Sequence, residues 1–317
     1  MVIKGNNSGL INKENFRFVG SGKAAISLIF RYLAEEKNYN PKYDEVLVPK
    51  WMGNWVYSQI HQVAFPSPSI SKNTKVIFLY HQFGIPQIIN NILEFSNENK
   101  LTIVEDCAHV LEGSYKGHSI GDVGEYTIYS FSKFIECGAL GGVASTTEPF
   151  LKYIDDKIKY SPRYIKDLSA CILKYISLVG INESHSSKIW NVYYSLCNFS
   201  YRPLMKAIKK VRNQIESEKK IRSSRFNQIR KELSSSEVLS YDTGENYVPV
   251  TVPLVITEKK ITEIQKIFIE HGYSINKVKF DINRDMLNTD YKNSLLLDIG
   301  SRNKSFSDHL EIVSKTL

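Results

Sequence analysis

Apolar and polar positions along the first half of the chain follow two alternating periods. Apolar residues recur at helical spacing in two stretches, at residues 26–33 and from about residue 86 to residue 93. Short apolar runs of the length of buried strands occur at residues 45–49, 75–80, 101–104, 126–129 and 143–145. Because strands and helices alternate along this part of the chain, we predict a largely parallel sheet with right-handed crossovers.

The pattern changes after residue 147. Residues 149–233 favour amphipathic helices, the last of them long and charged. Beyond a serine loop, residues 247–256 predict a strand that is interrupted by prolines and therefore lies near a sheet edge. A helix at 261–271, a strand at 294–298 and a helix at 307–317 follow. We therefore predict an α/β three-layer sandwich with a mostly parallel central sheet, in a large domain of residues 1–233, and a small C-terminal α+β domain of residues 234–317.

Composition narrows the class of protein. The chain has 317 residues, 42% of them hydrophobic, which suits a large domain with a smaller one. No apolar run approaches the roughly 18 residues of a membrane-spanning helix, and the start has no apolar signal region. The cysteines are widely spaced and form neither a disulfide framework nor a metal-binding pattern. We expect a cytoplasmic protein without a metal site. The cysteines are Cys107, Cys137, Cys171 and Cys197.

The net charge of +8 allows two interpretations. Its charges are scattered, which is typical of a solvated lysine-rich surface. Alternatively, the positive charge attracts an anionic substrate. No nucleic-acid-binding motif accompanies the basic residues, so we expect neither nucleic acid nor a membrane as a partner.

Chemically active side chains follow the predicted strands. The run at 101–104 ends in Glu105 and Asp106, with His109 close behind, and the run at 126–129 ends in Ser130 with Lys133 after it. Ends of neighbouring parallel strands meet at one edge of a sheet. A carboxylate, a histidine, hydroxyls and a lysine together suit pyridoxal phosphate (PLP), which has a basic ring nitrogen, a phosphate and an aldehyde.

Two further stretches are candidates for the same ligand. Ser21 is suited to cap the helix that follows, and the backbone N–H groups from Gly22 to Ala24 could receive a phosphate there. A plain capped helix is the alternative. Trp51 or Trp55 could stack on a cofactor ring, although tryptophans also serve as core or interface residues.

In sequence order, these motifs resemble the DegT/DnrJ/EryC1/StrS group of fold-type-I PLP enzymes, the sugar aminotransferases. The resemblance covers nearly the whole chain and implies an aspartate-aminotransferase-like fold. Its most specific part runs from Glu105 to Gly142. The matching pieces are Ser21-Gly22-Lys23-Ala24-Ala25, Asp44-Glu45-Val46-Leu47-Val48-Pro49, His81-Gln82-Phe83-Gly84, Val104-Glu105-Asp106-Cys107-Ala108-His109, Ser130-Phe131-Ser132-Lys133 and Gly141-Gly142-Val143.

The resemblance implies catalytic roles for three residues. Lys133 would form the Schiff base with PLP and then serve as acid and base. Asp106 would pair with the ring nitrogen, and His109 would lie near the ring oxygen.

The resemblance also implies a shared phosphate site in a homodimer. Ser130 and the backbone at Gly22 and Lys23 would hold the phosphate, where Lys23 stands in place of the family's usual threonine. A loop of the partner subunit would complete the site. The loop asparagine corresponds to Ser200, with Asn198 as a possible stand-in.

The resulting hypothesis is a PLP-dependent aminotransferase. It would move an amino group from an amino acid, L-glutamate in the first instance, to a keto sugar nucleotide in bacterial surface-polysaccharide or natural-product biosynthesis. One alternative is a PLP-dependent lyase or dehydratase, or an aminotransferase of a non-sugar ketone. Another is a catalytically silent homologue that acts as a binding subunit.

Overall fold

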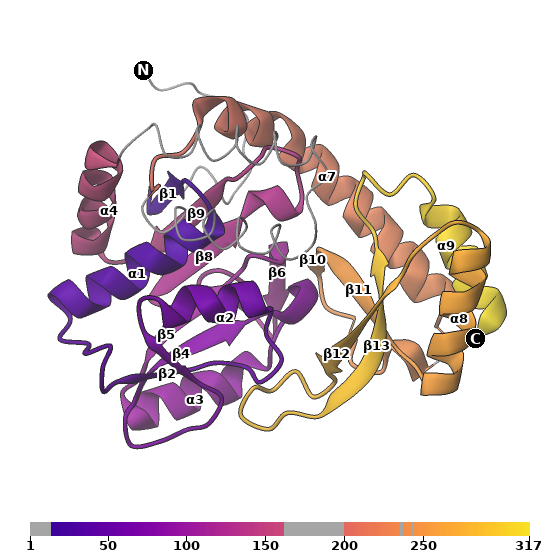
Figure 1. Cartoon of the computed structure of the whole chain (residues 1–317), viewed down its shortest axis with the longest axis horizontal. Helices are drawn as coiled ribbons and strands as arrows, with labels where there is room; N and C mark the ends of the chain where they lie inside the picture. The colour runs from indigo at the N-terminus through magenta and orange to yellow at the C-terminus, as the bar shows by residue number, and fades with distance from the viewer. Residues whose placement is uncertain (1–13, 162–199, 235–236, 243) are drawn as a thin grey trace, which may run out of the picture.

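The computed structural model describes residues 14–161, 200–234, 237–242 and 244–317 (Figure 1). The predicted helical positions between 162 and 199, together with Cys171, Cys197 and Asn198, lie outside the described residues. Within the described part of the chain, no helix is long and apolar enough to cross a membrane.

A seven-stranded sheet forms the centre of the first half of the chain, in the order β1-β9-β8-β5-β4-β2-β3. Strands β2, β3, β4, β5 and β8 are parallel, and β9 and β1 add to one edge in antiparallel pairing. The predicted mostly parallel sheet is therefore confirmed. Its strands are β1 (Phe16–Val19), β2 (Glu45–Leu47), β3 (Phe65–Ser67), β4 (Thr74–Tyr80), β5 (Thr102–Asp106), β8 (Tyr126–Ser130) and β9 (Gly141–Ser145).

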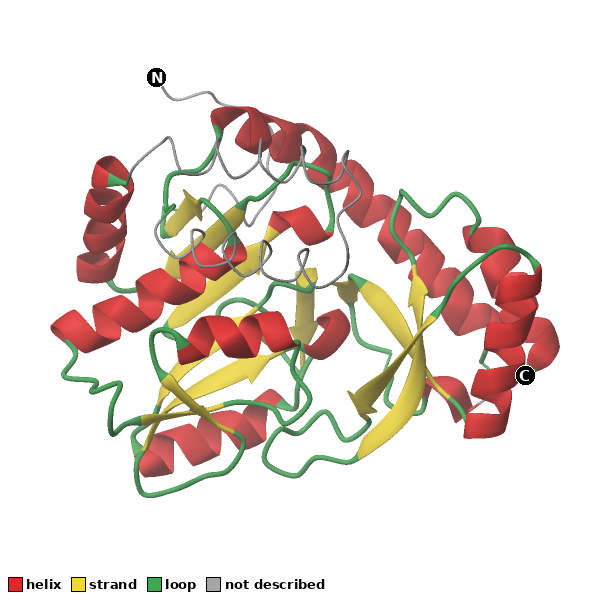
Figure 2. Cartoon of the chain, in the orientation of Figure 1, coloured by secondary structure: helices red, strands yellow, loops and turns green. Residues whose placement is uncertain are grey.

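Alternate residues of the strands pack against helices on opposite faces of this sheet. Val76 and Phe78 of β4 belong to the apolar cluster that α1, α2 and α4 share, whereas Ile77 and Leu79 pack with Ile92 of α3. This two-residue period makes the three layers of the predicted sandwich, with red helices on both sides of yellow strands in Figure 2. The helices are α1 (Gly22–Glu36), α2 (Asn54–His61), α3 (Ile89–Asn99) and α4 (Glu148–Tyr160).

The C-terminal part has its own sheet and its own apolar cluster. Its strands are ordered β11-β13-β12, and α8 and α9 lie side by side against them at the far end of the molecule from α4 (Figure 1). The long helix α7 runs from the first sheet toward this one. The domain boundary at residue 233 stays a prediction. The elements are α7 (Met205–Glu232), β11 (Thr251–Val255), α8 (Glu258–Glu270), β12 (Asn276–Asp281), β13 (Tyr291–Asp298) and α9 (Phe306–Thr316).

The interrupted strand predicted at 247–256 is two strands in the structure, and they belong to different sheets. β10 (Tyr247–Pro249) pairs with β6 (Val110–Tyr115), which also pairs with β7 (His118–Ser119), whereas β11 pairs with β13. Between them, the Val250 N–H donates to the carbonyls of Phe83 and His109, at 3.1 and 3.0 Å. These bonds turn the chain from one sheet to the other. The predicted edge position of β11 is confirmed.

The side chain of Gln82, at the carboxyl end of strand β4 in the large sheet, contacts the small sheet. Gln82 lies in the short helix η1 (Gln82–Gly84), just after β4. Its Nε2 donates to the Lys279 carbonyl at 2.8 Å, and its Oε1 accepts from the Asp281 N–H at 3.1 Å. The two parts of the chain are therefore joined beside the carboxyl ends of the central strands.

Candidate active site

Asp106 is the buried carboxylate at the centre of the site. It ends β5, where it pairs with Tyr80 at the end of β4, and only 2% of it is exposed. Its Oδ1 accepts the Ala108 N–H at 2.9 Å, and its other oxygen has no hydrogen bond among the described residues. Burial raises the pKa of Asp106 to about 6, although the Ala108 N–H, His81 and Lys133 oppose the shift. This carboxyl can therefore accept a proton or pair with a cation.

His109 lies at the same edge of the sheet, directly before β6. Its Nδ1 is 3.0 Å from the hydroxyl of Tyr80, and the ring of Phe83 stacks on it at 6.2 Å. Burial, together with the charge of Lys133, lowers the pKa of His109 to about 3. The imidazole is thus neutral at physiological pH.

Lys133 ends the short helix η2 (Phe131–Lys133), which follows β8 directly. Its side chain is exposed, and its charge acts on both Asp106 and His109. The backbone carbonyl of Lys133 accepts from Arg302 Nη2 at 3.4 Å. The structure thus brings together all three side chains that the sequence singled out as catalytic.

Glycines let the N-terminus of α1 approach the ends of β8 and β9. A Cβ on Gly22 would lie 3.3 Å from Ser130 Oγ, and one on Gly141 would lie 2.3 Å from the Ser21 carbonyl carbon.

Ser21 caps the helix as predicted, because its side chain accepts the Ala24 N–H at 3.0 Å. That amide is therefore already bonded to Ser21, and the expectation that the backbone N–H groups from Gly22 to Ala24 receive a phosphate stays a prediction. The Gly22 N–H has no partner in the described part of the chain.

The tryptophan candidates lie at the surface. Trp51 and Trp55 are 48% and 49% exposed, so neither is a core residue. The ammonium of Lys23 lies 5.4 Å from the ring centre of Trp55. The ring of Trp51 makes an edge-to-face contact with Tyr291, a residue of the small sheet, with ring centres 6.5 Å apart. Both rings are accessible for stacking.

Ser200 lies beside the α1 turn of its own chain. It is buried at 6% exposure, and a Cβ on Gly20 would lie 2.0 Å from its carbonyl oxygen. The Gly20 N–H donates to the Tyr201 carbonyl at 2.7 Å. The reach of this loop, predicted at residues 199–202, into a partner subunit stays a prediction, and Phe199 at its start lies outside the described residues.

A second buried carboxylate supports the site from behind, and sequence reasoning did not find its role. Glu105 accepts from His81 Nε2 at 3.0 Å and from the N–H groups of Gly121, Val123 and Gly124. The Gln87 N–H in turn donates to His81 Nδ1 at 3.2 Å. His81 therefore points away from the site and supports the strand that positions Asp106. The position of His81 at the end of a strand predicted that it lies at the edge of the sheet where the site is, but not that its side chain points away from the site.

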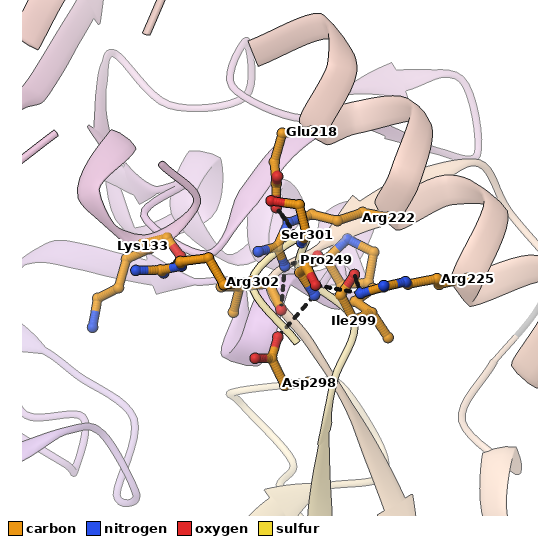
Figure 3. A network of polar contacts seen from close by, with 11 residues as sticks. Lys133, Glu218, Arg222, Arg225, Pro249, Asp298, Ile299, Ser301 and Arg302 are labelled. Atoms are coloured by element: carbon orange, nitrogen blue, oxygen red, sulfur yellow. Dashed lines mark hydrogen bonds and ion pairs between the residues drawn. The ribbon is translucent and has the colours of Figure 1, made fainter. Parts of the chain in front are cut away.

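An ion-pair network joins α7 to the loop that precedes α9 (Figure 3). Arg222 Nε donates to Glu218 Oε1 at 2.7 Å, and the Ser301 N–H donates to the same oxygen at 3.2 Å. Arg302, next along this loop, reaches the carbonyl of Lys133. The backbone that carries Lys133 is thereby connected to the small sheet.

The residues at this site fit PLP. Asp106 offers to a protonated ring nitrogen an oxygen that has no hydrogen bond among the described residues, and Lys133 offers an exposed amine to an aldehyde. The Gly22 N–H and the Ser130 hydroxyl meet at a helix N-terminus, which suits a phosphate.

Comparison with known proteins assigns the chain to a family. Residues 66–272 match the model of the DegT/DnrJ/EryC1/StrS aminotransferase family. This range includes Asp106, His109 and Lys133.

Curated relatives match over shorter stretches. GDP-perosamine synthase of Escherichia coli O157:H7 is 33% identical over 84 residues, which are 26% of this chain and 23% of that protein. The uncharacterized protein MJ1066 of Methanocaldococcus jannaschii is 37% identical over 93 residues, or 29% of this chain and 23% of that protein. The matched stretches thus span about a quarter of these relatives.

Solved structures show the same fold over nearly the whole chain. Helicobacter pylori PseC, an aminotransferase involved in the biosynthesis of pseudoaminic acid, covers 95% of this chain and 86% of its own, with 10% identity and a TM-score of 0.64. Bacillus subtilis NtdA with bound cofactor PMP covers 96% of this chain and 74% of its own, with 14% identity and a TM-score of 0.64. This chain therefore belongs to the DegT/DnrJ/EryC1/StrS aminotransferase family, whose cofactor is pyridoxal phosphate.

Proposed function

We propose that this chain is a cytoplasmic, homodimeric PLP-dependent aminotransferase that moves an amino group from L-glutamate to a keto sugar nucleotide. The observation that carries the proposal is the meeting of Asp106, His109 and Lys133 beside the N-terminus of α1. A buried carboxylate and a lysine that acts electrostatically on it suit an electron-withdrawing cofactor.

Each side chain has a task in this proposal. Asp106 holds a proton on the ring nitrogen, because its buried negative charge is favourable only beside a cation. His109 donates a hydrogen bond to the ring oxygen, and Ser130 and Gly22 hold the phosphate. Bound PLP supplies an electron-withdrawing ring and an aldehyde carbon that exchanges amino groups with the substrates.

Lys133 would hold the cofactor through its amine and, once the amino group of a substrate has displaced that amine, would carry the proton. Its amine takes a proton from the carbon of the donor amino acid and returns one during amination of the ketone. An exposed side chain at the end of a short helix has the freedom for these alternating positions. Trp51 or Trp55 stacks on the cofactor ring.

The substrate class rests on relatives and on charge. GDP-perosamine synthase and UDP-4-amino-4-deoxy-L-arabinose--oxoglutarate aminotransferase, from Shewanella sediminis, are among the proteins that match. The net charge of +8 favours an anionic substrate such as a nucleoside diphosphate sugar.

A half-reaction tests this function without knowledge of the sugar. The purified protein is loaded with PLP, L-glutamate is added alone, and released 2-oxoglutarate and the visible cofactor absorption are measured. We expect stoichiometric 2-oxoglutarate and loss of the visible band. Lys133→Ala should abolish the release of 2-oxoglutarate and the loss of the visible band. Lys152→Ala, a change of an exposed lysine on α4, should alter neither of these two signals.

Two results contradict the proposal in different ways. A protein that takes up PLP but releases no keto acid from any common amino acid fits a lyase or dehydratase. A protein that takes up no PLP fits a silent homologue.

A further inference from the structure

Tyr80 and His109 form a defined pair at the edge of the site. The Tyr80 hydroxyl lies 3.0 Å from His109 Nδ1, with ring centres 5.6 Å apart. On another side of the imidazole, Phe83 stacks almost parallel to it, at an interplanar angle of 8°. The imidazole is therefore held both by a hydrogen bond and by an aromatic face.

The direction of this hydrogen bond follows from the state of both rings. Tyr80 is 5% exposed, and burial, reinforced by the charge of Asp106, raises the pKa of its hydroxyl. The hydroxyl therefore keeps its proton. Burial and Lys133 lower the pKa of His109 to about 3, so the imidazole is neutral and carries one proton. In the described part of the chain, His109 Nδ1 is a hydrogen-bond partner of the Tyr80 hydroxyl. A buried hydroxyl that keeps its proton donates it to an available acceptor, so the Tyr80 proton points to His109 Nδ1.

A neutral imidazole that accepts at Nδ1 carries its proton on Nε2. Among the described residues, His109 Nε2 has no hydrogen-bond partner. The Nε2–H group is therefore available to a ligand.

We propose that Tyr80 is a positioning residue that fixes His109 as the Nε2–H tautomer, so that His109 presents a neutral proton donor to the ring oxygen of bound PLP. This inference rests on the proposed function and deepens it. Tyr80 itself touches neither cofactor nor substrate and acts through His109.

The charges around the pair explain why the donor must be neutral. Lys133, after β8, faces His109, and Asp106, on β5, faces Tyr80. In the protein without PLP, a second cation beside the Lys133 ammonium is unfavourable, so the imidazole is neutral before the cofactor binds. In a neutral ring only one nitrogen donates, and the bond from Tyr80 selects it.

The hydrogen bond is tested first in the full-length protein without cofactor. Tyr80→Phe removes only the hydroxyl, and the protein is labelled with ¹⁵N-histidine. His109→Gln assigns the His109 signals among the 7 histidines. We expect the His109 Nδ1 resonance in Tyr80→Phe to move to the value of a ring nitrogen without a hydrogen bond. Tyr129→Phe, which removes a buried hydroxyl that has no hydrogen-bond partner among the described residues, is the matched control and should leave the resonance unchanged.

The donor role is tested with PLP bound. Loss of a donor to the ring oxygen disfavours the negative charge there, so the bound cofactor should hold its proton to higher pH. In Tyr80→Phe the midpoint of the visible absorption titration should rise by about 0.5–1 pH unit, a three- to tenfold change in proton affinity. In a His109→Gln background, Tyr80→Phe should cause no further rise.

The outcomes separate this inference from the proposed function. If Tyr80→Phe leaves both the Nδ1 resonance and the titration midpoint at the wild-type values, the positioning role is wrong. If the wild-type protein takes up no PLP, the proposed function and the donor role fail together, and the cofactor-free spectra still decide whether the bond to Nδ1 exists.

Discussion

Glu218 and Arg222 form a buried ion pair one turn apart on α7, with Nε and Oε1 separated by 2.7 Å. Only 5% of Glu218 and 1% of Arg222 are exposed, so neither charge is solvated. Because the same carboxylate accepts the Ser301 N–H, the pair fixes the loop that leads to Arg302 and the Lys133 carbonyl.

Removal of the acid should destabilise the protein strongly. Glu218→Ala leaves the buried guanidinium without its counter-charge, and we expect a loss of about 3 kcal/mol in the free energy of unfolding. Urea denaturation measures it. Glu270→Ala breaks an exposed pair of the same spacing on α8 and should cost less than about 0.5 kcal/mol. Equal losses in the two variants would show that burial of the first pair has no energetic consequence.

Close backbone packing at Gly141 makes a second prediction. A methyl group there would lie 2.3 Å from the Ser21 carbonyl carbon, so Gly141→Ala must push α1 away from β9. We expect a loss of about 1–3 kcal/mol in stability and weaker PLP binding, measured by denaturation and absorption titration. Gly53→Ala is the control, since nothing lies within 4 Å of its Cβ position. Unchanged PLP affinity in Gly141→Ala would argue against a phosphate at this helix end.

Asp106 should make the stability of the cofactor-free protein depend on pH. Its carboxyl has an ordinary pKa of 3.8 and a pKa of about 6 in the folded chain. Between these values the folded state binds the extra proton, so the contribution of Asp106 to stability is greatest below about pH 4 and declines until about pH 6. The decline should be on the order of 2–3 kcal/mol.

Asp106→Asn isolates this contribution and tests the role of the carboxylate. The difference between wild-type and Asp106→Asn unfolding free energies should change across that pH interval and remain constant above it. With PLP bound, the variant should transaminate very slowly, because an amide cannot keep the ring nitrogen protonated. Turnover near the wild-type rate would refute the proposed role.

A composite site predicts an obligate dimer. If the loop at Ser200 completes the phosphate site of a partner, PLP retention and dimerisation should fall together on dilution. Light scattering and absorption on the same sample measure both. A monomer that retains PLP tightly would exclude a shared site.

The edge of the sheet at which the site lies was predictable, because Asp106 and Ser130 directly follow apolar runs of strand length. The contact between Tyr80 and His109 was not. It depends on the register that sets Tyr80 beside Asp106 and on the turn that brings His109 back, neither of which leaves a local sequence signal.

Strand β12 shows a different limit of sequence reasoning. Residues Asn276–Asp281 carry lysines between their apolar positions, and only Phe280 and Asp281 are buried. This polar pattern is common in loops, and pairing with β13 decides the conformation. The division between β10 and β11 was likewise hidden, because it depends on distant carbonyls that accept the Val250 N–H.

The Gln82 side chain has a consequence for association of the small sheet. β12 is an edge strand, and its outward peptide groups could pair with a strand of another molecule. The Gln82 amide donates to one of these groups and accepts from another, as a neighbouring peptide bond would. A single side chain thus imitates an additional strand beside residues 279–281 and opposes intermolecular β-pairing at that part of the edge.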